Sequence, residues 1–140
     1  MLRPILYGIL MWLVTIYAVR RGGWEEKIAS VALVINSYLT VLLISPADTS
    51  YHSIEYAVLE IDLSYLLIAI FIAFISRKFW PMWIAAMAAM VVIAHLLPLM
   101  PQFSPLLYSR AEALWSYPMW IMLAIATRKH DRLQRTTRAV

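Results

Sequence analysis

Five long apolar blocks, separated by short polar stretches, constrain the fold of this chain more than any other feature. They cover residues 4–19, 28–44, 61–75, 79–100 and 106–127. A helix needs about 20 residues to cross a hydrocarbon core of about 30 Å, so the fourth and fifth blocks are long enough by themselves. The third becomes long enough by including residues 56–60. None shows the alternation over about ten residues that a membrane β-barrel requires. The sequence therefore predicts an all-α integral membrane bundle of about five transmembrane helices.

The amino-acid composition supports a membrane protein and offers little chemistry for an enzyme. Hydrophobic residues make up 63% of the chain and charged residues 14%, whereas soluble domains are about 25% charged. The absence of cysteine excludes disulfides, thiolate metal sites and cysteine nucleophiles. The sequence has no Gly-x-Ser-x-Gly motif, and its three glycines provide no loop that could cradle a phosphate. We therefore expect no catalytic residue, no metal and no cofactor.

Basic residues predict the orientation of the chain, because Lys and Arg in short loops stay on the cytoplasmic side. Only Arg3 and Arg110 lie outside three clusters that contain the other ten of the twelve. With five spans, all three clusters fall on one face. The sequence thus predicts a bacterial inner-membrane location, with residues 1–127 as the membrane domain, the N-terminus outside, and residues 128–140 as a cytoplasmic tail. The clusters are Arg20, Arg21 and Lys27; Arg77 and Lys78; and Arg128, Lys129, Arg132, Arg135 and Arg138.

The first block leaves an alternative open. It is short and follows Arg3, as the core of a signal peptide follows a basic residue, although it ends in "AVRRGG" and not in a small-x-small cleavage site. If it lay on the membrane surface, the bundle would have four spans. The basic tail could bind anionic lipid or a protein partner.

Several polar residues are predicted at membrane depth, close to the outer face. Counting inward at 1.5 Å per residue places Asp62, His95 and Glu112 in one layer. By the helical period, Asp62 shares a face with small residues such as Ala69 and is expected to point inward. Glu60 falls on a Phe-rich face and is expected to reach the headgroups. Asn36 and Arg110 are secondary members of this layer.

This polar layer has three interpretations. The side chains could hydrogen-bond one another and fix the packing of the helices, or they could form a proton or cation site. In a different register they would be loop residues in water. A zinc site would need His52, His95 and an acid, and a haem held by His95 would need a dimer. His130 is expected in the tail.

The stretches "RKFWPMWIAAMAAMVVIAHL" and "AEALWSYPMWIMLAIATRKH" resemble a pattern found in small, uncharacterised, multi-pass bacterial inner-membrane proteins. The resemblance covers residues 58–130. It implies a helical membrane protein but no activity, so it assigns no role to any residue. Its elements here are Phe79, Trp80, Pro81, Trp83, His95, Trp115, Tyr117 and Pro118.

From these observations we expect a non-enzymatic accessory or assembly component of a membrane complex. The expected partners are the lipid bilayer and either another membrane protein or a second copy of the chain. Nucleic acid is not expected, because no recognition module accompanies the basic residues. One alternative is a small transporter or pore that uses Asp62, His95 and Glu112 as a proton or cation site. Another is a holin-type lytic membrane protein, which toxicity on expression would reveal.

Overall fold

The fold is built from helices alone in the part of the chain that the structure describes. This computed structural model describes residues 2–43, 56–100, 102 and 104–140, and among these the side chains of all but residues 98, 105–109 and 111–113. This confirms the predicted all-α bundle. The helices are α1 (Leu2–Arg21), α2 (Trp24–Leu43), α3 (Tyr56–Ile75), α4 (Trp80–Ala94), the short 3₁₀ helix η1 (Leu97–Leu99) and α5 (Pro105–Ala139).

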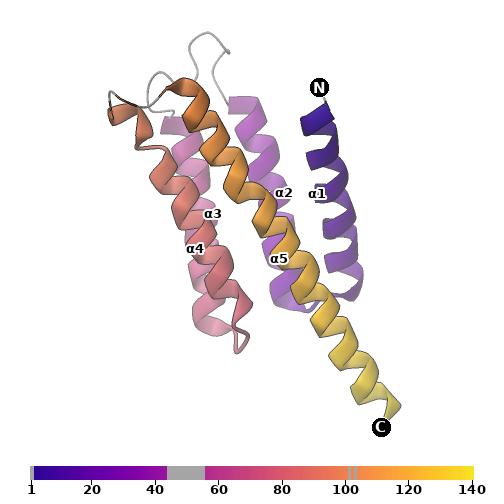
Figure 1. Cartoon of the computed structure of the whole chain (residues 1–140). Coiled ribbons are helices and arrows are strands. Elements are labelled where there is room, and N and C mark those ends of the chain that lie inside the picture. The colour runs from indigo at the N-terminus through magenta and orange to yellow at the C-terminus, as the bar shows by residue number, and fades with distance from the viewer. Residues whose placement is uncertain (1, 44–55, 101, 103) are drawn as a thin grey trace.

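The five α-helices alternate in direction and form a ring (Figure 1). Each packs against the next along the chain, α5 returns to α1, and α2 also contacts α5 across the ring. We call the end at which α1, α3 and α5 begin the upper end, as drawn in Figure 1, and the opposite end the lower end. The turns from α1 to α2 and from α3 to α4 therefore lie at the lower end. So does the C-terminal part of α5, which extends past the other helices.

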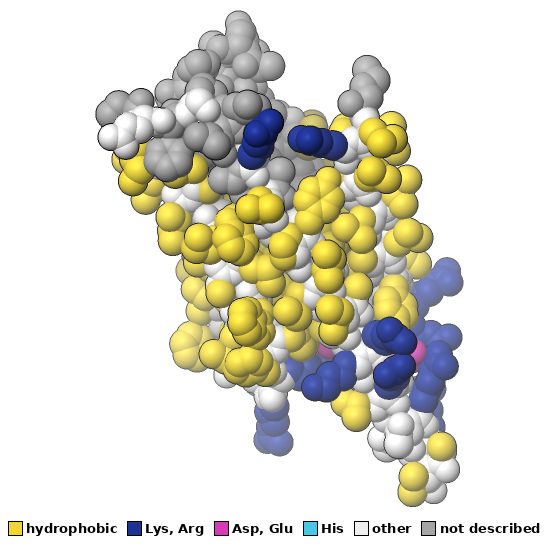
Figure 2. All heavy atoms as spheres, viewed as in Figure 1, with side chains coloured by type: hydrophobic (Ala, Val, Ile, Leu, Met, Phe, Trp, Pro, Cys, Tyr) yellow, Lys and Arg dark blue, Asp and Glu magenta, His cyan; other side chains and the backbone are white. Residues whose placement is uncertain are grey.

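The outer surface of the bundle is apolar along most of its length. Figure 2 shows a belt of hydrophobic side chains between two ends that carry Lys and Arg. Phe71 and Phe74 on α3 are 61% and 86% exposed, which water would disfavour but lipid accepts. Helices α1, α2 and α3 are each 20 residues long and apolar enough to cross a membrane. The chain is therefore a helical membrane protein.

The fourth helix is shorter than its apolar block predicts. The block extends to residue 100, but α4 has 15 residues and ends at Ala94, followed by η1. Pro98 has no backbone N–H to donate to the carbonyl of Ala94, and proline disfavours the α conformation of the residue before it. By contrast, the first block, which the sequence left least certain, forms the complete helix α1.

The basic tail is a continuation of the membrane domain and not a separate segment. Helix α5 runs without a break to Ala139, so residues 128–139 form its last three turns. Asp131 lies within the tail and pairs with Arg21 of α1 at 3.7 Å and with Arg135 at 3.1 Å. The start of the tail is therefore held against the lower end of the bundle, and the last part of α5 extends beyond the other helices (Figure 1).

Candidate functional site

A buried acid is held by two other helices in the upper half of the bundle. Asp62 of α3 is 6% exposed, and its Oδ2 lies 2.7 Å from Nε2 of His95. Asn36 of α2 donates a hydrogen bond from Nδ2 to Asp62 Oδ1 at 2.9 Å. His95, fully buried, is the C-cap residue that directly follows α4, and its backbone N–H bonds to the carbonyl of Val92. We call Asn36, Asp62 and His95 the Asp62 cluster.

The helical period explains why Asp62 points inward and Glu60 does not. Asp62, Tyr65, Ala69 and Ile72 belong to the buried face of α3. Glu60 is exposed, on the same side of the helix as the exposed Phe71 and Phe74 further along it. Residues three, four and seven apart share a face of a helix, so two acids separated by two positions face different surroundings. In the structure Asp62 is buried and Glu60 is exposed, and contact of Glu60 with lipid headgroups stays a prediction.

The structure separates the remaining predicted site residues. Arg110 is exposed at the upper end, and the five basic residues of the tail are exposed at the lower end. Glu112 lies in α5, but its side chain is outside the described residues, as is His52. Of the predicted polar layer, the structure therefore brings Asp62 into contact with both His95 and Asn36, and the place of Glu112 in the layer stays a prediction.

A cavity of about 970 Å³ opens into the upper half of the ring. This volume is at the upper end of the range of about 300–1,000 Å³ that ligand pockets occupy. All five α-helices contribute to its wall, and Asp62 and Asn36 border it. We call it the upper cavity. Its lining residues are Arg3, Pro4, Tyr7, Gly8, Met11, Trp12, Leu33, Asn36, Ser37, Tyr38, Thr40, Val41, Asp62, Tyr65, Ala88, Val91, Arg110, Leu114, Ser116, Tyr117 and Met119.

Two residues that line the upper cavity each hold a buried polar atom that has no hydrogen-bond partner among the described residues. They are Tyr65, through its hydroxyl, and Asn36, through Oδ1. A buried polar group without a partner costs about 1–3 kcal/mol, so such groups are rare. Neither atom is accessible to water from the cavity, so each carries this cost in the structure.

A chain of hydrogen bonds holds three helices together along the cavity wall. Trp120 of α5 donates from Nε1 to the hydroxyl of Tyr7 on α1 at 3.0 Å. The Tyr7 hydroxyl lies 3.0 Å from Oγ of Ser37 on α2, and Ser37 donates to the carbonyl of Leu33 at 2.9 Å. Since Ser37 uses its proton for Leu33, Tyr7 donates to Ser37. These bonds link α1, α2 and α5 side by side while leaving the space above them open.

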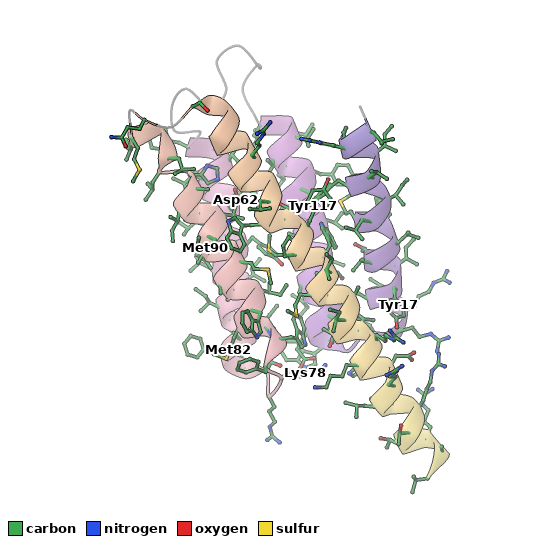
Figure 3. The ribbon with its side chains drawn as sticks, in the orientation of Figure 1. Tyr17, Asp62, Lys78, Met82, Met90 and Tyr117 are labelled. Atoms are coloured by element: carbon green, nitrogen blue, oxygen red, sulfur yellow. The ribbon has the colours of Figure 1, made fainter. Side chains whose placement is uncertain are left out.

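A second polar cluster lies at the lower end, opposite Asp62 (Figure 3). Lys78 Nζ is 3.2 Å from Glu25 Oε2, 2.9 Å from Glu26 Oε1 and 3.2 Å from His130 Nδ1. Ser76 donates to Glu25 at 3.1 Å, and Glu26 is fully buried. We call Glu25, Glu26, Ser76, Lys78 and His130 the Lys78 cluster. It links α2, the α3–α4 turn and α5 at the lower end of the ring.

Sequence analysis missed the Lys78 cluster, although a signal for it was present. Glu25 and Glu26 follow directly after Gly22 and Gly23 in a loop that the basic residues place on the same membrane face as Lys78. Two acids at the start of an apolar helix, facing a lysine of the next loop on that face, predict an ion pair. Glu25 and Glu26 were left out because only the acids expected near the outer face were considered as site residues.

The two-residue link before α2 requires glycine, because the Lys78 cluster packs against it. A Cβ atom on Gly22 would lie 2.5 Å from the carbonyl oxygen of Ala18 and 2.7 Å from Cβ of Glu26. A Cβ on Gly8 would meet nothing within 4 Å. We expect Gly22→Ala to lower the free energy of unfolding by about 1–3 kcal/mol through overpacking.

The matched control for Gly22→Ala is Gly8→Ala within α1. This change should leave stability the same or raise it by about 0.5–1 kcal/mol, since alanine is the better helix former. Thermal unfolding of the purified protein in detergent compares the two variants. Equal losses of stability in both would contradict the close packing at Gly22.

The described residues contain no group of three His, Asp or Glu side chains that could hold a metal ion. Comparison of the chain with protein-family models, with curated proteins and with solved structures gives no match. The proposed function therefore rests on the Asp62 cluster, the upper cavity and the Lys78 cluster.

Proposed function

We propose that this chain is a small transporter of the bacterial inner membrane that takes a solute from the outer face into the upper cavity. The Asp62 cluster is its proton-responsive site. The observation that carries this proposal is a buried acid–histidine pair, 2.7 Å apart, at the edge of a cavity of about 970 Å³. Ionisable residues within membrane helices are costly, and they typically mark proton relays and substrate pathways.

The proposed orientation places the upper end outside and the lower end in the cytoplasm, with five membrane spans. Ten of the twelve Lys and Arg residues belong to segments at the lower end, and positive charge is retained on the cytoplasmic side. In this orientation the cavity faces the outside and the Lys78 cluster links helices at the cytoplasmic end, as in an outward-facing carrier.

The Asp62 cluster can link proton binding to the state of the cavity. A histidine ring nitrogen and a carboxylate oxygen can each take up or release a proton. Adding one proton to the pair changes its charge by one unit inside the membrane, where an uncompensated charge costs several kcal/mol. A protonation change therefore favours whichever arrangement of the helices best solvates or neutralises the pair, and this couples protons to solute access.

The expectation of an accessory component without transport remains a prediction, as does the holin alternative. Lipid contact alone accounts for the exposed apolar side chains, so they give no support to a partner interface. The basic tail orients any multi-span protein. Only the transporter uses the cavity and the buried pair together, and for that reason we prefer it.

Thiol accessibility tests the proposal directly, because the native chain has no cysteine. Gly8 lines the cavity and has open space where a Cβ would stand, whereas its neighbour Ile9 is 52% exposed on the lipid-facing surface. A charged, membrane-impermeant thiol reagent needs a thiolate in water. Applied from the outer side of sealed vesicles, it should modify Gly8→Cys at least about tenfold faster than Ile9→Cys.

The transporter also predicts access to the same position from the cytoplasmic side. In inside-out vesicles, the rate at which the reagent modifies Gly8→Cys is divided by its rate with free cysteine at the same pH. This ratio should depend on pH. The additional change Asp62→Asn should remove this pH dependence. Modification of Gly8→Cys from the outer side alone, at every pH tested, would show a receptor and contradict transport. Equal slow reaction of Gly8→Cys and Ile9→Cys would contradict the water-filled cavity.

A further inference from the structure

The two basic residues at the upper end both line the upper cavity. Arg3 lies in the first turn of α1 and Arg110 in the second turn of α5, and both side chains are exposed. All the other Lys and Arg residues lie at the lower end. Both guanidinium groups belong to exposed side chains that line the cavity, where they can meet an anion that enters it. Guanidinium groups bind phosphate and carboxylate through two parallel hydrogen bonds.

The interior of the cavity is suited to an apolar body and not to a small hydrated ion. Its lining below the arginines includes Met11, Leu33, Val91 and Met119, and aromatic side chains stand along the wall. Tyr117 packs edge-on against Tyr7 at 5.4 Å, and Trp12 packs against Tyr38 at 6.3 Å. A cavity of about 970 Å³ has room for a molecule the size of a typical drug.

We propose that the solute is an amphipathic anion, with a phosphate or carboxylate headgroup held by Arg3 and Arg110 and an apolar body between α1, α2 and α5. This assignment of the solute class rests on the proposed function of the upper cavity.

The test is protection of Gly8→Cys from the thiol reagent in phosphatidylcholine vesicles. The probes are dodecyl phosphate, dodecyltrimethylammonium and inorganic phosphate, so that chain length, head charge and phosphate are separated. Dodecyl phosphate should protect at a concentration at least about tenfold lower than dodecyltrimethylammonium or inorganic phosphate. A factor of about ten is expected when a ligand lacks one good charge-assisted contact. Equal protection by the cationic and anionic probes would overturn the proposal.

Two pairs of variants locate the headgroup. Arg3→Gln combined with Arg110→Gln should raise the protecting concentration of dodecyl phosphate at least about tenfold. Arg20→Gln combined with Arg138→Gln removes two exposed arginines from the lower end and should leave it unchanged. If both pairs weaken protection equally, the anion senses only the net charge of the protein, and the site at the arginines is wrong.

A change of lipid composition distinguishes an anion that comes from solution from one that comes from the membrane. Replacing part of the phosphatidylcholine by phosphatidylglycerol should leave the labelling rate unchanged if the anion comes from solution, and should slow it in the absence of probe if a membrane lipid enters the cavity. Either result supports an amphipathic anion if it is lost in the variant Arg3→Gln, Arg110→Gln, and contradicts it if that variant gives the same result.

The two proposals can fail independently. If Gly8→Cys reacts from both sides while no anionic probe protects it, transport stands and the solute class is wrong. If it reacts from the outer side alone while dodecyl phosphate protects it, the class stands and transport is wrong.

Discussion

Replacing Lys78 by methionine should lower the free energy of unfolding by about 3 kcal/mol, among the largest effects of any single change in this chain. The ammonium group lies within 3.2 Å of both Glu25 and Glu26, whose side chains are 8% and 0% exposed. Methionine keeps the length of the side chain and removes its charge, so two carboxyl groups would stay in a buried place without their cation. Removing one partner of a buried ion pair costs about 3–5 kcal/mol, and we take the lower value because Lys78 itself is 30% exposed.

The adjacent residue supplies the control. Arg77 is exposed in the same turn, so Arg77→Met should change stability by no more than about 0.5 kcal/mol. Thermal unfolding in detergent measures both variants. The triple change Glu25→Gln, Glu26→Gln and Lys78→Met should lose less than the sum of its parts, because the glutamines leave no uncompensated charge. Equal effects at positions 77 and 78 would mean that the Lys78 cluster contributes nothing to stability.

Asp62→Leu should lower the free energy of unfolding by about 2–4 kcal/mol, whereas Glu60→Leu should change it by no more than about 0.5 kcal/mol. The two acids differ by two positions, but Asp62 accepts hydrogen bonds from Asn36 and bonds to His95, and Glu60 is exposed. Leucine at position 62 removes one bond from the fully buried His95 and one from the partly buried Asn36. At position 60 it adds apolar surface where the neighbouring side chains already face lipid.

A double change measures the contact itself. His95→Leu combined with Asp62→Leu should cost less than the two single changes added together, by about 1 kcal/mol or more, because the pair is lost only once. Thermal unfolding in detergent gives all four values of this cycle. Small and equal effects at positions 60 and 62 would show that both acids are solvated, and additive effects of the double change would show that Asp62 and His95 do not interact.

Much of the fold could be predicted because it depends on local properties of the chain. The length of each apolar block predicted a helix. The third block was extended back to Tyr56 to reach the about 20 residues of a membrane span, and α3 begins at that residue. The helical period separated Asp62 from Glu60. The error at α4 was also local: apolar character continues to residue 100, but the missing N–H of Pro98 ends the helix one turn earlier. Hydropathy alone does not detect that loss.

The candidate site was only partly predictable, because it depends on contacts between helices. Asp62, His95 and Asn36 were placed in one layer by depth, but depth does not show which pairs meet. A shift of one residue along a helix turns a side chain by about 100° and moves it by 1.5 Å, enough to break a hydrogen bond. The unpartnered hydroxyl of Tyr65 gave no sequence signal, since a tyrosine in an apolar helix normally finds a partner.

By itself, the sequence determined that this chain forms membrane-crossing helices, that its basic residues gather at one end, and that one face of each helix is buried. These properties follow from hydrophobicity, charge and the 3.6-residue period, and each acts within a single helix. Only the tertiary structure decided that Asp62 meets His95, that Lys78 joins Glu25, Glu26 and His130, and that the ring leaves a cavity open at its upper end. Those features depend on how far each helix is rotated and shifted against its neighbours, because a hydrogen bond or a cavity is created by the small distances between side chains of different helices.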